Sequence, residues 1–232
     1  MADGVAGTTA TTKPVVIFGT GDFARIAQVY FTRDSALTVA AFTADRDRIE
    51  QPTLLGLDVV PFEDLLATHP PDRFAMFVAI GFSRMNKARA EVYRRCKDLG
   101  YELVTYVCSK AVLWGENEIG DNTFILESNV VQPFVKIGSN VVLWSGNHIG
   151  HDSVIGDHCF IASHVVISGN VTIGEYTFMG VNATVRDGVT IAPACLIGAG
   201  TLILKDTEAG QVFPGEATKP SRLLSHQLRG MG

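Results

Sequence analysis

The chain has 232 residues, of which 47% are hydrophobic, so it is long enough to bury the core of one or two domains. Its net charge of -5 comes without a block of lysine or arginine, which argues against binding to nucleic acid or to an anionic membrane. No apolar run approaches the roughly 20 residues of a transmembrane helix. Four cysteines without C-x-x-C spacing favour reduced thiols in the cytoplasm.

The N-terminal part of the chain predicts a short tail and then a small α/β domain. Residues 1–13 have neither a cationic start nor an apolar stretch, which indicates a disordered tail rather than a signal peptide. Apolar strands are predicted at 15–18, 36–44 and 74–81. With the helical patterns between and after them, they predict a Rossmann-like βαβαβ domain over 14–106, whose ligand crevice lies at the carboxyl ends of the strands.

Two helices of this domain are predicted to begin in different ways, one after a glycine turn and the other after a serine N-cap. The first helix follows the turn Gly19-Thr20-Gly21, where glycine lets the backbone approach an anion at a helix N-terminus. The alternative is a tight turn that binds nothing, and the motif alone does not separate the two. The last helix is predicted to begin with Ser83 as its N-cap and to end before Gly100.

The second half of the chain repeats with a period of six residues. An aliphatic residue occurs at each of sixteen positions: Leu113, Ile119, Ile125, Val131, Ile137, Leu143, Ile149, Ile155, Ile161, Ile167, Ile173, Met179, Val185, Ile191, Ile197 and Ile203. Glycine often follows this position, where we expect it to adopt the positive φ of a tight corner. Neither helical nor alternating periodicity explains the pattern, which predicts a parallel β-helix with three six-residue faces per turn over 107–210. A C-terminal segment, 211–232, follows it.

Repeats of the form Ile-Gly-x-x-x-x resemble those of the hexapeptide acyltransferases. A half-size nucleotide fold followed by such a coil closely resembles the sugar acetyltransferases of the sialic-acid and bacillosamine type (NeuD/PglD-like), from Pro14 to about Arg222. The resemblance implies a left-handed β-helix, a homotrimer, and acetyl-CoA bound between adjacent coils. It also implies an acetyltransferase that acts on a nucleotide-linked amino sugar for surface-polysaccharide or glycan biosynthesis, at nitrogen in preference to oxygen.

The resemblance places the nucleotide-linked sugar, rather than NAD, in the N-terminal domain. Five residues would face the diphosphate: Gly19, Thr20, Gly21, Asp22 and Phe23. Asp45 would approach the ribose or base. The crevice would be lined by Ala79, Ile80 and Gly81. Arg84 and Lys87 would add positive charge, the alternative being that both are solvated helix residues.

Four of the six histidines lie between residues 147 and 164, in NHIGHDSVIGDHCFIASH. The family places its catalytic base in a segment that "IGHDSVIG" matches, so the resemblance predicts His151 as the base, with Asp152 orienting it. The alternative for His151 is a corner residue exposed to water. His148 would lie near the substrate. His158 and His164 are six residues apart, which indicates repeat decoration rather than one converging site, although His164 could still touch CoA.

The remaining parts of a transferase are also assigned by the resemblance. Gly169, in "ISGNVTIG", matches the position whose backbone N-H stabilises the oxyanion, and it would also border CoA. Four further residues would border the pantetheine arm, with plain corner geometry as the alternative for each: Gly180, Val181, Gly198 and Ala199. Lys219 would meet a CoA phosphate, although the two residues before it depart from the family's usual pattern.

Two further classes of function compete with an N-acetyltransferase or its O-acetylating variant. Some hexapeptide coils are zinc-dependent carbonic anhydrases, and zinc needs three convergent nitrogen ligands. This coil has no histidine between 113 and 147 and no pair spaced five apart, so no metal is predicted. The other alternative is a scaffold that binds a nucleotide sugar without turnover, against which the intact His151, Asp152 and Gly169 argue.

Overall fold

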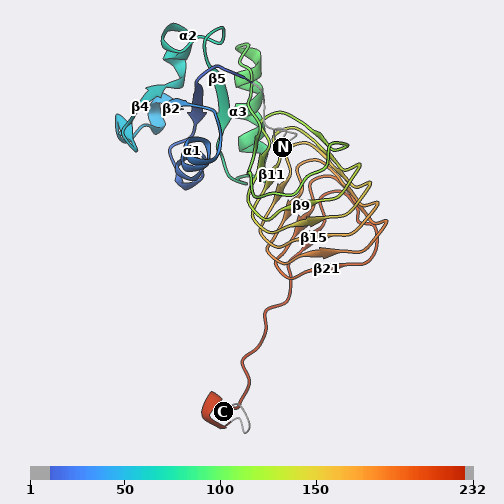
Figure 1. Cartoon of the computed structure of the whole chain (residues 1–232). Helices are drawn as coiled ribbons and strands as arrows, with labels where there is room; N and C mark the ends of the chain where they lie inside the picture. The colour runs from blue at the N-terminus through green and yellow to red at the C-terminus, as the bar shows by residue number, and fades with distance from the viewer. Residues whose placement is uncertain (1–10, 228–232) are drawn as a thin grey trace.

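The computed structural model describes residues 11–227, so most of the tail predicted at 1–13 lies outside the described residues. An α/β domain lies beside one side of a long coil, and the C-terminal segment runs away from the coil's far end (Figure 1). Within residues 11–227, no helix is long and apolar enough to cross a membrane.

The α/β domain is built on a five-stranded sheet in the order β3-β4-β2-β1-β5. Its strands are β1 (Val15–Phe18), β2 (Val39–Ala44), β3 (Thr53–Leu54), β4 (Leu57–Pro61) and β5 (Ala75–Val78). The three predicted strands are β1, β2 and β5, and β1 pairs in parallel with both of the others. The hairpin of β3 and β4 was not predicted, because β3 has only two residues and β4 ends in proline.

The helices of the domain are α1 (Asp22–Asp34), α2 (Leu65–Thr68) and α3 (Lys87–Asp98), with short 3-10 turns at Arg46–Arg48 and Phe62–Asp64. A third 3-10 turn, Ser225–Gln227, lies in the C-terminal segment. The prediction of Ser83 as the N-cap of the last helix is wrong, since α3 begins four residues later, after Asn86. Asn86 adopts a left-handed conformation with φ of 63°. Gly100 lies just beyond the helix with φ of +84°, as predicted.

The coil is a parallel β-helix with three faces, and each face is named by the side chains on its outer surface. The aromatic face consists of β6 (Tyr106–Val107), β8 (Phe124–Ile125), β11 (Val142–Leu143), β14 (Phe160–Ile161), β17 (Phe178–Met179), β20 (Leu196–Ile197) and β22 (Val212–Phe213). The valine face consists of β9 (Val130–Val131), β12 (His148–Ile149), β15 (Val166–Ile167), β18 (Thr184–Val185) and β21 (Leu202–Ile203). The polar face consists of β7 (Glu118–Ile119), β10 (Lys136–Ile137), β13 (Val154–Ile155), β16 (Thr172–Ile173) and β19 (Thr190–Ile191).

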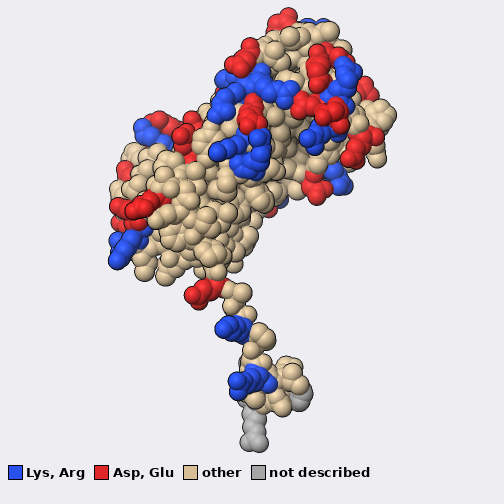
Figure 2. All heavy atoms as spheres, turned by 180° about the vertical axis from the view of Figure 1, so that it is seen from behind, with Lys and Arg blue, Asp and Glu red and all other residues tan. Residues whose placement is uncertain are grey.

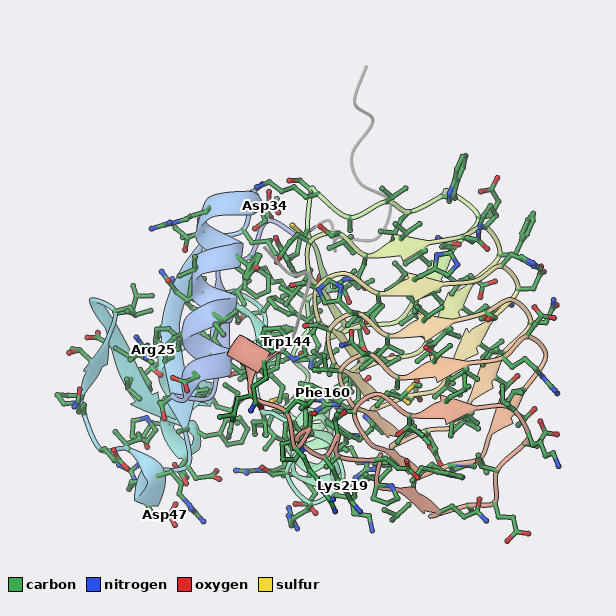
Figure 3. The ribbon with its side chains drawn as sticks, turned by 90° about the horizontal axis from the view of Figure 1, so that it is seen from below. Arg25, Asp34, Asp47, Trp144, Phe160 and Lys219 are labelled. Carbon is green, nitrogen blue, oxygen red and sulfur yellow. The ribbon has the colours of Figure 1, made fainter. Side chains whose placement is uncertain are left out.

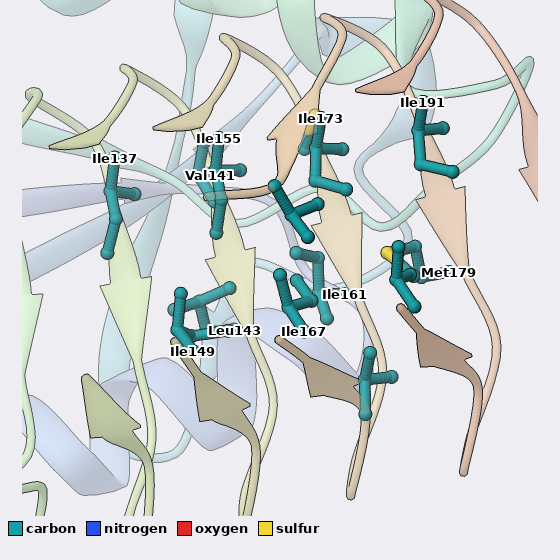
Figure 4. Packing of buried hydrophobic residues seen from close by; sticks show 14 of the residues in the cluster. Ile137, Val141, Leu143, Ile149, Ile155, Ile161, Ile167, Ile173, Met179 and Ile191 are labelled. Atoms are coloured by element: carbon teal, nitrogen blue, oxygen red, sulfur yellow. The ribbon is translucent and has the colours of Figure 1, made fainter. Parts of the chain in front are cut away.

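The six-residue ladder forms the interior of this coil, which confirms the predicted β-helix. Strands eighteen residues apart pair in register, as Ile137 does with Ile155, so three six-residue faces complete a turn. The ladder side chains stack inside the coil (Figure 4). From Ile125 to Ile203 all of them are buried, and the first two, Leu113 and Ile119, pack against the cluster.

The prediction that the ladder glycines take positive φ is wrong. The left-handed residue of each corner lies two positions further on, for example Asn140 with φ of 59° or His158 with φ of 63°. The glycines are needed because neighbouring turns of the coil approach closely. A Cβ atom on Gly150 would lie 2.4 Å from the backbone nitrogen of Gly169 in the next turn. Glycine therefore permits close stacking of the coil turns rather than a special backbone conformation.

Candidate active site

His151 and Asp152 lie at the corner between the valine face and the polar face, directly after β12. The Nδ1 atom of His151 lies 2.9 Å from Asp152 Oδ2. The backbone N-H of His151 donates to Gln132 Oε1 over 2.8 Å. Because an ionised carboxylate only accepts, this pair favours the tautomer with a proton on Nδ1 and a free lone pair on Nε2. Both side chains are about half exposed, at 53% and 52%.

Gly169 lies on the next turn of the same corner, directly against this imidazole. A Cβ atom there would lie 2.7 Å from His151 Nε2 and 2.9 Å from Asp187 Oδ1. Gly169 does not adopt positive φ, so what requires glycine here is the side chain of His151 rather than the backbone. Within residues 11–227 the Gly169 N-H donates no hydrogen bond, so the coil does not use this donor.

A second group of predicted residues lines an apolar pocket of about 520 Å³ at the corner between the aromatic and valine faces. Gly180, Val181 and Ala199 form part of its wall. Four aromatic side chains complete it: Phe82, Trp144, Phe160 and Phe178. Trp144 and Phe160 point into the region between α1 and the coil (Figure 3). Gly198 belongs to the same corner, where its close neighbour is the backbone of Pro214.

The two groups lie at opposite edges of the valine face. His151 follows a strand of that face, whereas Gly180 precedes one. The polar face begins beyond His151, and the aromatic face ends just before Gly180. A single chain therefore brings His151, Asp152 and Gly169 together but does not bring them to the predicted pantetheine residues.

The other histidines of the cluster have separate environments. His148 lies half-buried on β12 of the valine face. His158 and His164 both occupy left-handed corner positions, with φ of 63° and 59°, as expected for repeat decoration. His158 is nevertheless buried, and this burial lowers its pKa to about 4. His164 lies against Gly146, where a Cβ would approach its ring to 2.5 Å.

The glycine turn of the α/β domain lies at the carboxyl end of β1, as predicted. Gly19 has φ of +127° and its α-carbon faces the Ala79 carbonyl, which a Cβ would approach to 2.7 Å. Gly21 is open, since a Cβ there meets no atom within 4 Å. Thr20 lines a cavity of about 180 Å³ together with residues of β3 and β4.

The remaining residues predicted for the nucleotide-linked sugar are partly engaged elsewhere. The Asp45 carboxylate lies 2.6 Å from Arg95 Nη2, and Asp22 pairs with Arg25 at 3.3 Å. Phe23 packs against Phe77, Phe124 and Trp144, so its ring belongs to the contact between the domains and only its backbone is left for a diphosphate.

The two predicted cations and the C-terminal lysine differ in their ion pairs and in their positions. Arg84 pairs with Glu91, so its charge is compensated, and it lies before α3 rather than on it. Lys87 is the first residue of α3. Lys219 is exposed in the segment that leaves the coil (Figure 1), and its contact with a CoA phosphate stays a prediction. Charged side chains gather mainly on the α/β domain, while much of the coil surface visible in Figure 2 carries none.

Sequence reasoning missed several residues of these two corners. Gln132 holds the backbone of His151, and Asp187 lies beside Gly169. The length of one coil turn was the signal that would have found them, because residues about one turn apart lie next to one another: Asp187 is 18 residues from Gly169, and Gln132 is 19 from His151. Phe82 could not be found in this way, because it comes from the other domain. Within residues 11–227 no group of three or more histidine, cysteine or acidic residues could hold a metal ion.

Comparison with known proteins supports the resemblance in repeat and fold. A family model described as bacterial transferase hexapeptide (six repeats) matches residues 118–151 and 140–169. PerB from Caulobacter crescentus, in complex with CoA and GDP-perosamine, matches with a TM-score of 0.79 and 28% identity, over 90% of this chain and 97% of that one. The search of curated proteins gave no match.

Two further solved structures share the fold. The acetyltransferase domain of PglB from Neisseria gonorrhoeae, in complex with acetyl coenzyme A, has a TM-score of 0.78 and 24% identity, over 91% of this chain and 100% of that one. WeeI from Acinetobacter baumannii has a TM-score of 0.66 and 20% identity, over 88% of this chain and 97% of that one. The α/β domain and the coil therefore occur together in other proteins as one architecture.

Proposed function

We propose that this chain, which has hexapeptide repeats and a fold similar to that of a perosamine N-acetyltransferase, transfers the acetyl group of acetyl-CoA to the amine of a nucleotide-linked amino sugar. The observation that carries this proposal is the His151-Asp152 pair, whose imidazole lies against Gly169. It occurs in a chain of which 90% matches the structure of a perosamine N-acetyltransferase from Caulobacter crescentus. The four cysteines are buried free thiols, which suits the cytoplasm.

The residues of the His151 corner supply what acyl transfer needs. The amine nitrogen attacks the thioester carbonyl carbon while Nε2 of His151 accepts its proton. Asp152, 2.9 Å from Nδ1, stabilises the imidazolium that forms. The unused N-H of Gly169 stabilises the oxyanion. The carbon-sulfur bond then breaks, and the proton passes to the departing thiolate of CoA, so the amide and free CoA are the products.

A deciding experiment measures thiol release from acetyl-CoA with a panel of UDP-, GDP- and dTDP-linked amino sugars. We expect release with at least one of them and a product that carries an N-acetyl group. An O-acetyl product would move the activity to a sugar hydroxyl. If a nucleotide sugar binds but no sugar of the panel causes thiol release from acetyl-CoA, the protein is the non-catalytic scaffold.

We propose that the complete site forms between subunits of a homotrimer. His151 and the aromatic pocket lie at opposite edges of the valine face, and a cyclic trimer joins different edges of neighbouring copies. Three of the five outward side chains of that face are apolar and exposed, with Val130 at 39%, Val166 at 40% and Leu202 at 60%. His151 of one subunit would then work beside the pocket and nucleotide crevice of the next.

Placing a charge on the valine face is expected to dissociate the trimer. Val166→Glu would bury a carboxylate in an apolar contact, which costs several kcal/mol unless the carboxylate is paired. Light scattering should show a trimer for the parent and a monomer for this variant, with loss of acetyl transfer. Val154→Glu is the matched control, because Val154 is 38% exposed but lies on the polar face. Full activity of a monomeric Val166→Glu protein would contradict the shared site.

The glycine turn allows a test of nucleotide binding that leaves the fold unchanged. Gly21 has ordinary φ and open space around it, so Gly21→Val should fold normally. Its branched side chain would occupy the space into which a diphosphate must come, so affinity for the nucleotide sugar should fall about tenfold or more. Calorimetry checks this, with acetyl-CoA affinity as the control. Unchanged affinity for the nucleotide sugar would remove this turn from the site.

A further inference from the structure

Arg89, on the first turn of α3, is completely buried between the two domains. Its Nε donates to Asn140 O over 3.2 Å, and its Nη2 donates to His158 O over 2.9 Å and to Cys159 O over 3.1 Å. Its Nη1 donates to Gly81 O over 3.0 Å. One guanidinium thus joins the carbonyls of two coil turns to the end of the predicted nucleotide crevice.

Among residues 11–227, every acceptor of Arg89 is a neutral oxygen, so the cation is buried there without a compensating carboxylate. Burial lowers its pKa to about 9, which leaves it charged at neutral pH. A well-packed apolar side chain of similar volume usually stabilises such a position as well as a buried ion does. Stability alone therefore does not explain an arginine here, whereas the fixed fork of five donors explains the geometry that it holds.

What Arg89 holds is an unusual turn between β5 and α3. Arg84, Met85 and Asn86 have φ of 53°, 52° and 63° in succession, which non-glycine residues adopt only where surrounding contacts impose it. Asn86 is buried and donates to Tyr176 O over 3.1 Å. Its Oδ1 accepts from Arg89 Nη1 over 3.1 Å.

The same turn presents Phe82 to the aromatic pocket. The Phe82 ring lies 5.3 Å from Phe160 and 4.7 Å from Phe178 between ring centroids, although 54% of the residue is exposed. Gly81, which accepts from Arg89, is its immediate neighbour in the chain. A shift of the turn would therefore move the crevice wall and the pocket wall together.

A row of hydrogen-bonded coil residues holds the end of β5, which leads into the crevice wall. The N-H of Val78, the last residue of β5, donates to Asn122 Oδ1 over 2.7 Å, and Asn122 Nδ2 donates to Asn140 Oδ1 over 2.8 Å. Asn140 Nδ2 in turn lies 2.8 Å from His158 Nδ1, which is neutral and accepts. These coil residues are eighteen apart, at the left-handed position of one corner.

We propose that Arg89 is a positioning residue that fixes the nucleotide crevice relative to the aromatic pocket, so that a sugar held by its nucleotide reaches the thioester in one orientation. This inference rests on the proposed function for its catalytic consequence. The hydrogen bonds of Arg89 form a clamp between the two domains, which are joined rigidly through α3 and do not hinge.

Arg89→Met, Arg89→Lys and the control Arg94→Met test this proposal. Met and Lys keep the length of the side chain but lose the fork. Arg94, on the same helix, is exposed and donates to the Tyr176 hydroxyl of the coil, so Arg94→Met controls for the loss of an exposed contact between the domains. With both substrates saturating, kcat of the Arg89 variants should fall about 10- to 100-fold, the cost of slight misplacement of reacting groups. Affinities for acetyl-CoA and for the nucleoside diphosphate should stay within about twofold, because each half of the site is intact.

Hydrogen exchange supplies a readout that does not depend on activity. The amides of residues 86–88 and of Ala90 bond within the turn and the start of α3, and they should exchange faster in the Arg89 variants but not in Arg94→Met. If kcat falls only together with both affinities and the folded fraction, Arg89 is merely structural and the proposal fails. If Arg89→Met does not fold, Arg89→Lys decides the question. Unchanged kcat and unchanged hydrogen exchange in Arg89→Lys would also overturn the proposal. A parent protein without transferase activity would remove the proposed function, while exchange would still test the clamp.

Discussion

Replacing His151 by alanine is expected to lower kcat by about 10² to 10⁴, the usual contribution of a general base. The side chain is half exposed and forms no part of the core, so the proposed trimer and the KM values should be largely unchanged. Loss of rate would arise because the variant lacks Nε2 of His151, the atom that accepts the proton of the amine in the proposed mechanism. Steady-state kinetics with the parent and the variant measures this directly.

The pH profile separates base catalysis from simple substrate positioning. Only the neutral imidazole accepts a proton, so the parent rate should fall as the pH is lowered, and this acid limb should disappear in His151→Ala. His69→Ala, remote in the α/β domain, should leave both rate and profile unchanged. Exhaustive chelation should also have no effect on the parent. Full activity of His151→Ala, or activity lost to a chelator and restored by zinc, would mean that the histidine cluster serves another purpose.

The coil was predictable because its physics is one-dimensional. A side chain every six residues must point inward if each turn is to bury its apolar face on the next, and the sixteen aliphatic positions meet that requirement without interruption. The same period places His151 one turn below Gly169, since they are eighteen residues apart. The six-residue period does not show which of two reasons requires a glycine, close stacking of the turns or a positive φ. Close stacking and positive φ favour the same residue at Gly150, and only the coordinates show that stacking is the reason.

The contact between the domains was not predictable in this way. Asn122, Asn140 and His158 look like ordinary corner residues, because asparagine is common wherever φ is positive. Their partners, Val78 and Arg89, lie far away in the sequence, in a strand and a helix with no repeat to align them. The late start of α3 has the same origin. Ser83 is a good N-cap by local rules, but the bonds from Asn86 to the coil hold the chain in a left-handed turn instead.

Gly169→Ala is expected to lower kcat about 100-fold, although it adds only one methyl group. Its Cβ would lie 2.7 Å from His151 Nε2 and 2.8 Å from Cε1, too close for the imidazole to keep its place. Because the ring is half exposed, it can swing outward, so stability should change little while the base is displaced. A displacement of about 1 Å is enough for a loss of this size. Gly115→Ala is the matched control, since a Cβ there meets no atom within 4 Å.

The double variant Gly169→Ala/His151→Ala identifies the cause. Alanine keeps the backbone N-H of residue 169, so any oxyanion contact remains and the effect of the methyl group should pass through the imidazole alone. Changes that act through one group are not additive. The double variant should therefore be no slower than His151→Ala by itself. If the two losses multiply instead, the methyl group disturbs the oxyanion or the thioester directly, and the space beside Gly169 belongs to the substrate rather than to His151.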